Sequence, residues 1–304
     1  MKKLMITLGA MTAAAVAFTA MADEKTPAPN EAAKPETVQA EPAEMEEEED
    51  SPLFEFALQL DIKSAYVSHC RIFSDAPVAQ YDIWGQINLP ENFGWIGVGV
   101  WASQELHKKH SSVDYGNGGK RLGGFGEFDY EIVYGNSIGP VNFTASHLWY
   151  TYPRCGWTSQ NFWTFGAEYD NEIIVPSFKF YWEYCHGNKP GAAFMIDFAL
   201  SRSFQLTEQL SLKLTSKTTL YTSEYSRYLS DGELDRAAFG GWDNGIALSY
   251  ALTDNITIGG NLNFLYKLDH SVRHCPGWDS YSVGGDHSTH AGLLYGGVSV
   301  CFAF

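Results

Sequence analysis

The sequence predicts an all-β protein that forms a closed, transmembrane antiparallel β-barrel of about 12 strands, preceded by a disordered acidic segment. Three observations lead to this prediction. Apolar and polar residues alternate with a period of two through most of the chain after residue 53, the intervening segments are alternately short and long, and such an alternating stretch ends at Phe304. Alternation with this period gives a strand two faces that lie in different surroundings.

The composition agrees with this class and excludes several others. The chain has 304 residues, of which 45% are hydrophobic and 18% charged, so it can form one large domain and is neither collagen nor a coiled coil. The aromatic residues (19 Phe, 17 Tyr and 9 Trp) and 29 Gly favour strands and turns. The formal net charge of −16 argues against a nucleic-acid partner, because that partner requires a basic face.

Residues 1–22 have the features of a secretory signal peptide. Lys2 and Lys3 precede an apolar stretch over residues 4–19, and Ala20-Met21-Ala22 is an A-x-A cleavage site. A membrane-anchor helix is disfavoured because the stretch is short and Ala-rich and is followed by acidic sequence with proline. We therefore expect export, with cleavage after Ala22.

Residues 23–52 are of low complexity, rich in Glu, Ala and Pro, and include the acidic run from Glu46 to Asp50. With almost no β-branched or aromatic residues, this segment cannot bury a core, so we expect it to be disordered in the periplasm. We interpret it as a solvated tether, and binding of cations or of a basic partner is the alternative. The barrel is expected to occupy residues 53–304.

The alternation marks the strands one by one. In the first strand, Phe54, Leu58 and Ile62 lie on an apolar face, whereas Glu55 and Asp61 lie on a polar face. The expected strands are 55–68, 78–89, 95–106, 125–136, 141–152, 161–171, 175–184, 193–204, 210–223, 241–252, 255–268 and 291–304. Short turns alternate with long loops, and each strand has about the length of a tilted membrane-spanning strand, as in bacterial outer-membrane barrels.

A soluble β-sandwich would contain similar strands, but two features favour the membrane barrel. Aromatic residues such as Trp163, Trp182 and Tyr266 gather near strand ends, as in interfacial girdles. Val298, Val300, Phe302 and Phe304 share one face of the final strand. A strand of this kind resembles the signal by which outer-membrane proteins are recognised for insertion, so the barrel-assembly machinery is an expected partner through the Phe304 strand.

Short motifs spread along residues 55–304 resemble one family of barrels. Ser64-Ala65-Tyr66-Val67 with Pro77-Val78-Ala79-Gln80 resembles the first hairpin of the TorF-like putative porins, and Tyr150-Thr151-Tyr152-Pro153 resembles a strand end in the middle of their chains. Trp242-Asp243-Asn244-Gly245 followed by Leu248-Ser249-Tyr250 resembles one of their late strands. The chain departs from the family at His69-Cys70-Arg71, where an Arg-Gly pair is usual. The resemblance implies an outer-membrane porin and no particular solute.

If the apolar faces contact lipid, the polar faces line the lumen. The residues expected to line it are Asp61, Asp82, Glu127, Asp129, Glu131, Glu168, Glu183, Asp197, Lys63, Lys179 and Lys213. Acidic residues outnumber basic ones in this set, so an open pore is expected to prefer cations. The alternative is a plugged barrel in which these groups pair with one another, because twelve strands lie between side-chain-filled barrels and wide porins.

Four of the five cysteines lie at or near the expected outside loops, and export permits disulfides. Neighbouring loops in a closed barrel would pair Cys70 with Cys275 and Cys155 with Cys185, which leaves Cys301 as a thiol facing inward. A zinc or copper site is the alternative, because His69, His186 and His274 each adjoin a loop cysteine. No C-x₂-C spacing supports it, so we expect no metal and no cofactor.

The predicted function is passive diffusion of small hydrophilic solutes across the outer membrane of a Gram-negative bacterium, with the outer-membrane lipid around the barrel. A non-conducting structural or interaction barrel is the alternative, favoured by a lumen filled with paired charges or by a loop folded inward. A lipid-modifying barrel enzyme ranks third. The pair Ser146-His147, which lies within an expected strand, places its two side chains on opposite faces of that strand, so we expect no enzyme.

Overall fold

The computed structural model describes residues 53–90, 93–106, 124–153, 158–171, 173–186, 189–230, 232, 234–275, 278 and 291–304. The long strands are β1 (Phe54–Lys63), β4 (Val78–Asn88), β5 (Trp95–Glu105), β6 (Phe125–Ile138), β7 (Val141–Thr151), β8 (Gln160–Tyr169), β9 (Val175–His186), β10 (Lys189–Gln205), β11 (Leu210–Tyr221), β12 (Ala238–Ala251), β13 (Ile256–Tyr266) and β14 (Gly292–Ala303). The short elements are β2 (Tyr66–Ser68), β3 (Arg71–Ser74), α1 (Ser223–Leu229) and α2 (His270–Arg273). Within these ranges, no helix is long and apolar enough to cross a membrane.

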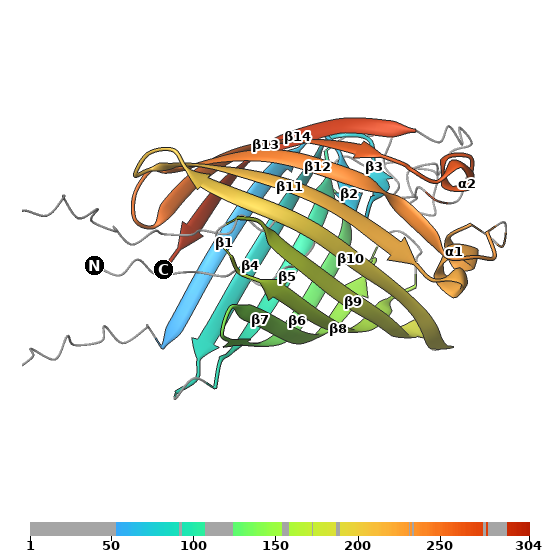
Figure 1. Cartoon of the computed structure of the whole chain (residues 1–304), viewed down its shortest axis with the longest axis horizontal. Coiled ribbons are helices and arrows are strands. Elements are labelled where there is room, and N and C mark those ends of the chain that lie inside the picture. Colours follow the sequence, from blue (N-terminus) through green and yellow to red (C-terminus); the bar gives the residue numbers. More distant parts are fainter. Residues whose placement is uncertain are drawn as a thin grey trace, which may run out of the picture.

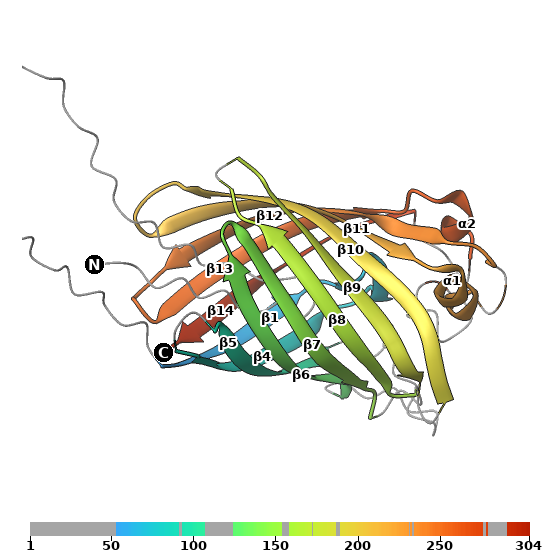
Figure 2. The same cartoon turned by 60° about the horizontal axis from the view of Figure 1, so that its bottom comes forward.

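The twelve long strands form one closed barrel, in which each strand pairs antiparallel with its neighbour in the chain (Figures 1 and 2). The barrel closes where β1 pairs with β14, from Ala57 opposite Ala303 to Lys63 opposite Gly297. On its other side β1 pairs with β4 from Phe54 to Lys63. Closure removes both open sheet edges, so the backbone N–H and C=O groups of every long strand can form hydrogen bonds with neighbouring strands on both sides. The predicted fold, a closed antiparallel barrel of twelve strands, is confirmed.

The two ends of the barrel differ. At one end, which we call the turn end, short connections join β4 to β5, β6 to β7, β8 to β9, β10 to β11 and β12 to β13. The other end, called the loop end, carries α1, α2 and the segment with β2 and β3 (Figure 1). Not every connection there is long: β9 ends at His186 and β10 begins at Lys189, whereas the sequence predicted a loop from Cys185 to Ala192. Both strands continue past the predicted ends and pair with each other there.

The outer face of the barrel is apolar. Its exposed side chains include Ile62, Ile83, Val98, Ile132, Trp163, Phe178, Trp182, Phe198, Leu248, Leu262, Phe264, Leu294 and Val298. Residues at the alternate positions face the interior, and many are polar and buried, for example Gln59, Asp61 and Glu131. The sequence alternation therefore corresponds to an outer and an inner face, as expected for strands between two different surroundings.

The first expected strand, 55–68, is longer than the strand that forms. β1 ends at Lys63, and the chain then leaves the barrel wall as a small hairpin in which β2 pairs with β3. Ile72 and Ser74 are fully buried, and Tyr66 is 6% exposed. This hairpin lies inside the barrel because its apolar and aromatic residues gain more from burial there than from exposure in a surface loop.

Tight packing between strands gives a prediction about glycine. A Cβ atom added at Gly97 on β5 would lie 2.2 Å from the ring of Trp84, whereas one added at Gly260 on β13 would have its nearest neighbour, the Gly297 carbonyl oxygen, at 3.7 Å. We expect Gly97→Ala to lower the free energy of unfolding by about 1–3 kcal/mol, measured by urea titration of the detergent-folded protein. Gly260→Ala is the matched control and should change it by less than about 0.5 kcal/mol. Equal effects of the two substitutions would contradict this packing.

Candidate functional site

The candidate site is the barrel interior, and its main feature is the segment of residues 64–77, which we call the plug hairpin. It contains β2, the turn His69-Cys70 and β3. Both turn residues have positive φ angles, 48° for His69 and 56° for Cys70. This arrangement is typical of a two-residue hairpin turn, which usually takes Asn-Gly because most other residues are strained at positive φ. Contacts at the tip must therefore hold these residues in place.

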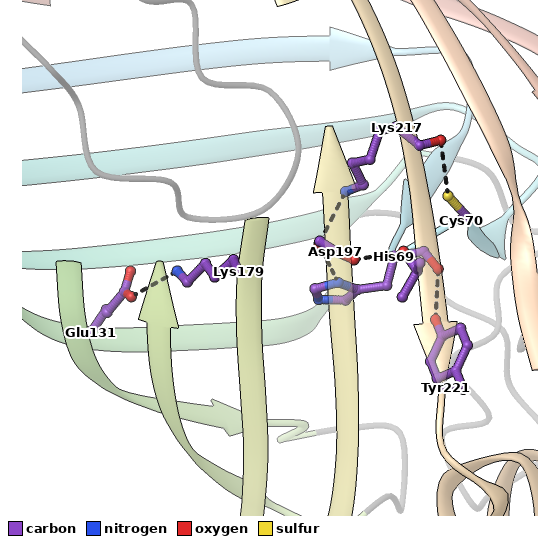
Figure 3. A network of polar contacts seen from close by, with 8 residues as sticks. His69, Cys70, Glu131, Lys179, Asp197, Lys217 and Tyr221 are labelled. Carbon is purple, nitrogen blue, oxygen red and sulfur yellow. Dashed lines mark hydrogen bonds and ion pairs between the residues drawn. The ribbon is translucent and has the colours of Figure 1, made fainter. Parts of the chain in front are cut away.

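The tip of the plug hairpin is bound to β10 and β11 (Figure 3). His69 Nδ1 lies 3.0 Å from Asp197 Oδ2, and the Tyr221 hydroxyl donates a hydrogen bond of 2.6 Å to the His69 carbonyl oxygen. The Cys70 thiol donates to the carbonyl oxygen of Lys217 at 3.8 Å. Lys217 Nζ in turn lies 3.5 Å from Asp197 Oδ2, so one carboxylate links the tip to both strands.

These contacts mean that the plug hairpin crosses the whole lumen. It connects β1 to β4, which are adjacent in the wall. Its tip reaches β10. Counted from β1 by way of β14, β10 is the fifth strand round the barrel, and counted from β4 by way of β5 it is the sixth. The tip is therefore anchored to the wall opposite its own base.

The base of the plug hairpin packs against β5 and β6. The Tyr66 hydroxyl donates a hydrogen bond of 2.9 Å to Glu127 Oε2, and its ring centroid lies 5.4 Å from that of Trp101. Ser74 donates to Glu105 Oε2 at 3.1 Å, and Arg71 Nε donates to the carbonyl oxygen of Trp278 at 2.7 Å. The hairpin is therefore held at both ends and at its side.

Around the plug hairpin, the loop half of the interior is filled by one hydrophobic cluster. Its members come from the hairpin, the strands and both helices, and are Tyr66, Val78, Trp101, Leu148, Tyr150, Tyr152, Phe162, Tyr181, Met195, Tyr221, Tyr225, Leu229, Leu234, Ala238, Val272, Cys275 and Trp278. All of them are buried. These side chains therefore pack around the plug hairpin in this half of the barrel.

The turn half of the interior has a different lining. Its inward-facing residues on β11, β13 and β14 are small or polar, for example Ser211, Thr215, Asn261 and Ser299, and all are partly exposed. Because their side chains point into the barrel, this exposure indicates that the interior is less tightly packed here than in the loop half.

The structure places the predicted lumen residues on inward-facing positions with different degrees of burial. Asp61, Glu127, Asp129, Glu131, Glu183 and Asp197 are buried, and Asp82, Glu168, Lys63, Lys179 and Lys213 are partly exposed. Lys179 Nζ on β9 lies 3.3 Å from Glu131 Oε1 on β6 (Figure 3). Since β7 and β8 lie between these strands in the wall, this pair reaches across the interior.

The same residues do not form one ring. Acidic residues of β1, β4 and β6 lie together on one side of the lumen, where Asp82 interacts with Asp61 and Glu131. Glu183 instead contacts His186 at 2.6 Å and Gln160 at 3.1 Å near the loop end. Glu168 and Lys213 interact with each other nearer the turn end.

Sequence reasoning missed several residues of the site. The sequence predicts His69 in a loop, Tyr66 near a strand end and Tyr221 in the barrel wall, and it assigns none of them to the interior. Asp243 was also missed, although it is buried on β12 and accepts a hydrogen bond of 2.6 Å from Tyr295. The signal available in the sequence was weak: Ile72 and Phe73 are apolar where a solvated loop was expected, and the structure buries Ile72.

The predicted Cys70–Cys275 disulfide is not formed in this structure. Cys70 lies at the plug tip, is 1% exposed, and has its thiol at Lys217. Burial raises the pKa of this thiol to about 12, so it is protonated at neutral pH. Cys275 instead belongs to the cluster of Val272 and Trp278. The prediction assumed that residue 70 lies in an outside loop, whereas the hairpin carries it inward.

The other cysteine assignments have different outcomes. Cys155 lies outside the described residues, so the Cys155–Cys185 pairing stays a prediction. Cys301 is buried on β14 and faces the interior, opposite Gln59 of β1. Among the described residues, no group of three or more His, Cys, Asp or Glu side chains is arranged to hold a metal ion.

The tip contacts predict how the plug hairpin is released. Removing the ring by His69→Ala, together with Tyr221→Phe, takes away the two shortest polar contacts of the tip. We expect Cys70 to react with a maleimide at least tenfold faster than in the unsubstituted protein, measured by mass spectrometry of the Cys70 peptide. Glu168→Gln, which lies far from the tip near the turn end, should leave the rate unchanged. An unchanged rate in the double variant would show that the tip is held by other contacts.

Comparisons with known proteins were made for the whole chain. No protein-family profile and no curated protein sequence matches it. Among solved structures, it is similar to the NanC porin, with 9% identity, 81% of this chain and 98% of that chain covered, and a TM-score of 0.47. It is also similar to the KdgM porin, with 6% identity, 82% and 99% covered, and a TM-score of 0.42. OmpT, an outer membrane protein of Vibrio cholerae, matches with 8% identity, 83% and 98% covered, and a TM-score of 0.35. At these identities and TM-scores the likeness carries no conclusion about function, and the resemblance to the TorF-like family stays a prediction.

Proposed function

We propose that the protein is an outer-membrane porin for small hydrophilic solutes, and that the plug hairpin closes it at the loop end. The observation that carries this proposal is a closed barrel with an apolar outer face and a polar, charged inner face. Only closed barrels and helices can span a bilayer, because the lipid offers no partner for backbone polar groups. The outer face includes rings such as Trp163, Trp182 and Phe264, as membrane barrels do.

The proposed mechanism follows from the two halves of the interior. Solutes enter the turn half freely, since its polar lining is partly exposed. Passage requires that the plug hairpin leave its contacts with Asp197 and Tyr221, so that the loop half opens. Inward carboxylates outnumber inward lysines, so the open channel should prefer cations. Export through cleavage after Ala22, and insertion by the barrel-assembly machinery through the strand with Phe304, are parts of the same proposal.

The second candidate is a non-conducting structural or interaction barrel. The inward plug hairpin and the buried cluster around Tyr66, Tyr150 and Tyr181 favour it, because a permanently packed interior has no passage. The third candidate, a lipid-modifying enzyme, gains no support from the pair Ser146-His147. Ser146 bonds to Glu131 and Thr164 inside the barrel, whereas His147 contacts Tyr184 on the outer face. The expectation that the protein is not an enzyme stays a prediction.

Planar-bilayer recordings distinguish the first two candidates. We expect brief, rare openings from the unsubstituted protein and long openings from the variant His69→Ala with Tyr221→Phe, because the plug tip is released. In a salt gradient, the reversal potential of the open state should indicate cation preference. Silence from both proteins, each shown to be folded by its resistance to SDS without heating, would contradict the porin and favour the non-conducting barrel.

Acidification should open the channel. Burial lowers the pKa of His69 below its ordinary value, and the nearby Lys217 and Lys179 act in the same direction, whereas Asp197 partly offsets the effect. A released His69 would have the ordinary pKa of about 6.5. As the pH falls, the state with the plug hairpin released therefore binds more protons than the state with the hairpin in place. The hairpin is held most strongly above about pH 6.5 and less strongly below it.

The measurement is the open probability between about pH 7 and about pH 5. We expect it to rise in the unsubstituted protein and to stay constant in His69→Gln, whatever its basal level. The conductance of a single open channel reports the titration of lumen carboxylates separately. A rise of equal size in His69→Gln would assign the pH dependence to another group.

A further inference from the structure

Asp129, on the inner face of β6, is a buried carboxylate to which no donor bonds within the described ranges. It is 1% exposed, and both of its carboxylate oxygens lack a donor. The neighbouring Glu127 carboxyl can bond to it only through a shared proton. Glu127 and Glu131 share its face of the strand, and Asp82 of β4 is also among the groups that interact with it. Burying a charged group without compensation is costly, so an orphaned carboxylate of this kind requires an explanation.

The neighbouring acids differ from Asp129 because each has a basic group close by. Glu131 contacts Lys179 at 3.3 Å. Glu127 interacts with Arg71 of the plug hairpin, and Asp82 interacts with Lys63 of β1. The groups that act most on Asp129 are themselves carboxylates. Asp129 is therefore the member of this group of four acids that has no positive charge close by.

Aromatic rings stand on both sides of this carboxylate. Trp101 of β5 and Tyr150 of β7 are the residues directly opposite Asp129 on the two neighbouring strands. Both are buried, at 4% and 5% exposure, and the Tyr150 hydroxyl also has no hydrogen-bond partner within the described ranges. Side chains opposite each other in this way have Cβ atoms about 5 Å apart. The faces of such rings attract cations.

We propose that Asp129, Trp101 and Tyr150 form a binding site for a small ammonium-type cation inside the barrel. The carboxylate oxygens without a donor at the site are both oxygens of Asp129, one of Asp82 and one of Glu131, and the Tyr150 hydroxyl, which can also accept, lacks a partner too. An ammonium group supplies what they lack, a positive charge and several N–H donors, and it is also attracted by the rings. A metal ion fits less well, since no group of three metal-ligating side chains was found in the described part of the chain.

The plug hairpin covers this site. Tyr66 bonds to Glu127 and packs against Trp101, so a cation enters or leaves when the hairpin moves. Binding does not require that the barrel conduct, so this proposal and the porin proposal can fail independently. The site would select amines over other cations among the solutes that reach the interior.

The test measures thermal stability of the full chain folded in detergent, as the temperature at which the SDS-resistant form is lost. Methylammonium chloride should raise this temperature by roughly 2–4 °C over sodium chloride at equal ionic strength, because a ligand that binds only the folded state stabilises it. Tetramethylammonium, which has no N–H donors, should give a smaller rise. A rise of equal size with sodium or tetramethylammonium would overturn the assignment of an ammonium group.

Two substitutions locate the effect. Asp129→Asn should abolish the response to methylammonium and, because it removes an uncompensated buried charge, should itself raise the transition temperature in sodium chloride. Tyr150→Phe keeps the ring and should weaken the response. Glu168→Gln, a matched acid-to-amide change on the inner face of β8, should leave the response intact. A response to methylammonium that persists in Asp129→Asn would overturn the proposal. So would the absence of any response from the unsubstituted protein, and that result would indicate that Glu127 and Asp129 share a proton instead.

Discussion

The rest of this structure depends on the pairing of β1 with β14. In lipid, every strand needs a hydrogen-bonded neighbour on both sides, and this pairing supplies the last one. It also sets which residues face inward, since a shift of one residue would turn every side chain of a strand to the other face. With Asp61 opposite Ser299 and Gln59 opposite Cys301, polar groups of both strands face the interior. The inner carboxylates and the outer apolar belt are therefore consequences of one register.

Closure also explains how the plug hairpin can exist. β1 and β4 are hydrogen-bonded neighbours from end to end, so residues 64–77 have no gap to bridge. Such a segment is free to fold inward if its contacts offset the entropy lost in ordering it. Those contacts come from the opposite wall, through Asp197 and Tyr221, and from the near wall, through Glu127. The strained turn at His69 and Cys70 is tolerated because both residues are held by these groups.

The sequence predicted the wall well and the interior poorly, for a physical reason. A period of two shows only that successive residues of a strand face two different surroundings. Every strand of the wall has lipid on one side and the packed interior on the other, so the pattern appears in each of them. β2 continues the same alternation past Lys63, so the pattern alone did not separate it from β1. Asp243 was missed because Trp242 and Asn244 flank it, and the polar Asn244 on the outer face obscures the alternation. The tip contacts of the plug hairpin join residues more than a hundred positions apart, and no local pattern records them.

The balance of charge inside the barrel bears on the choice between a conducting and a permanently filled interior. A barrel that served only as a rigid body would be more stable with apolar residues at these positions, since burying carboxylates costs more than their pairing returns. Here Glu127, Asp129 and Glu131 follow one another on the inner face of β6, and only the outer two have basic groups close by. Features that break the rules of core packing are expected where a structure must do something besides fold. The acids of β6 therefore favour an interior that receives cations over one that is merely filled.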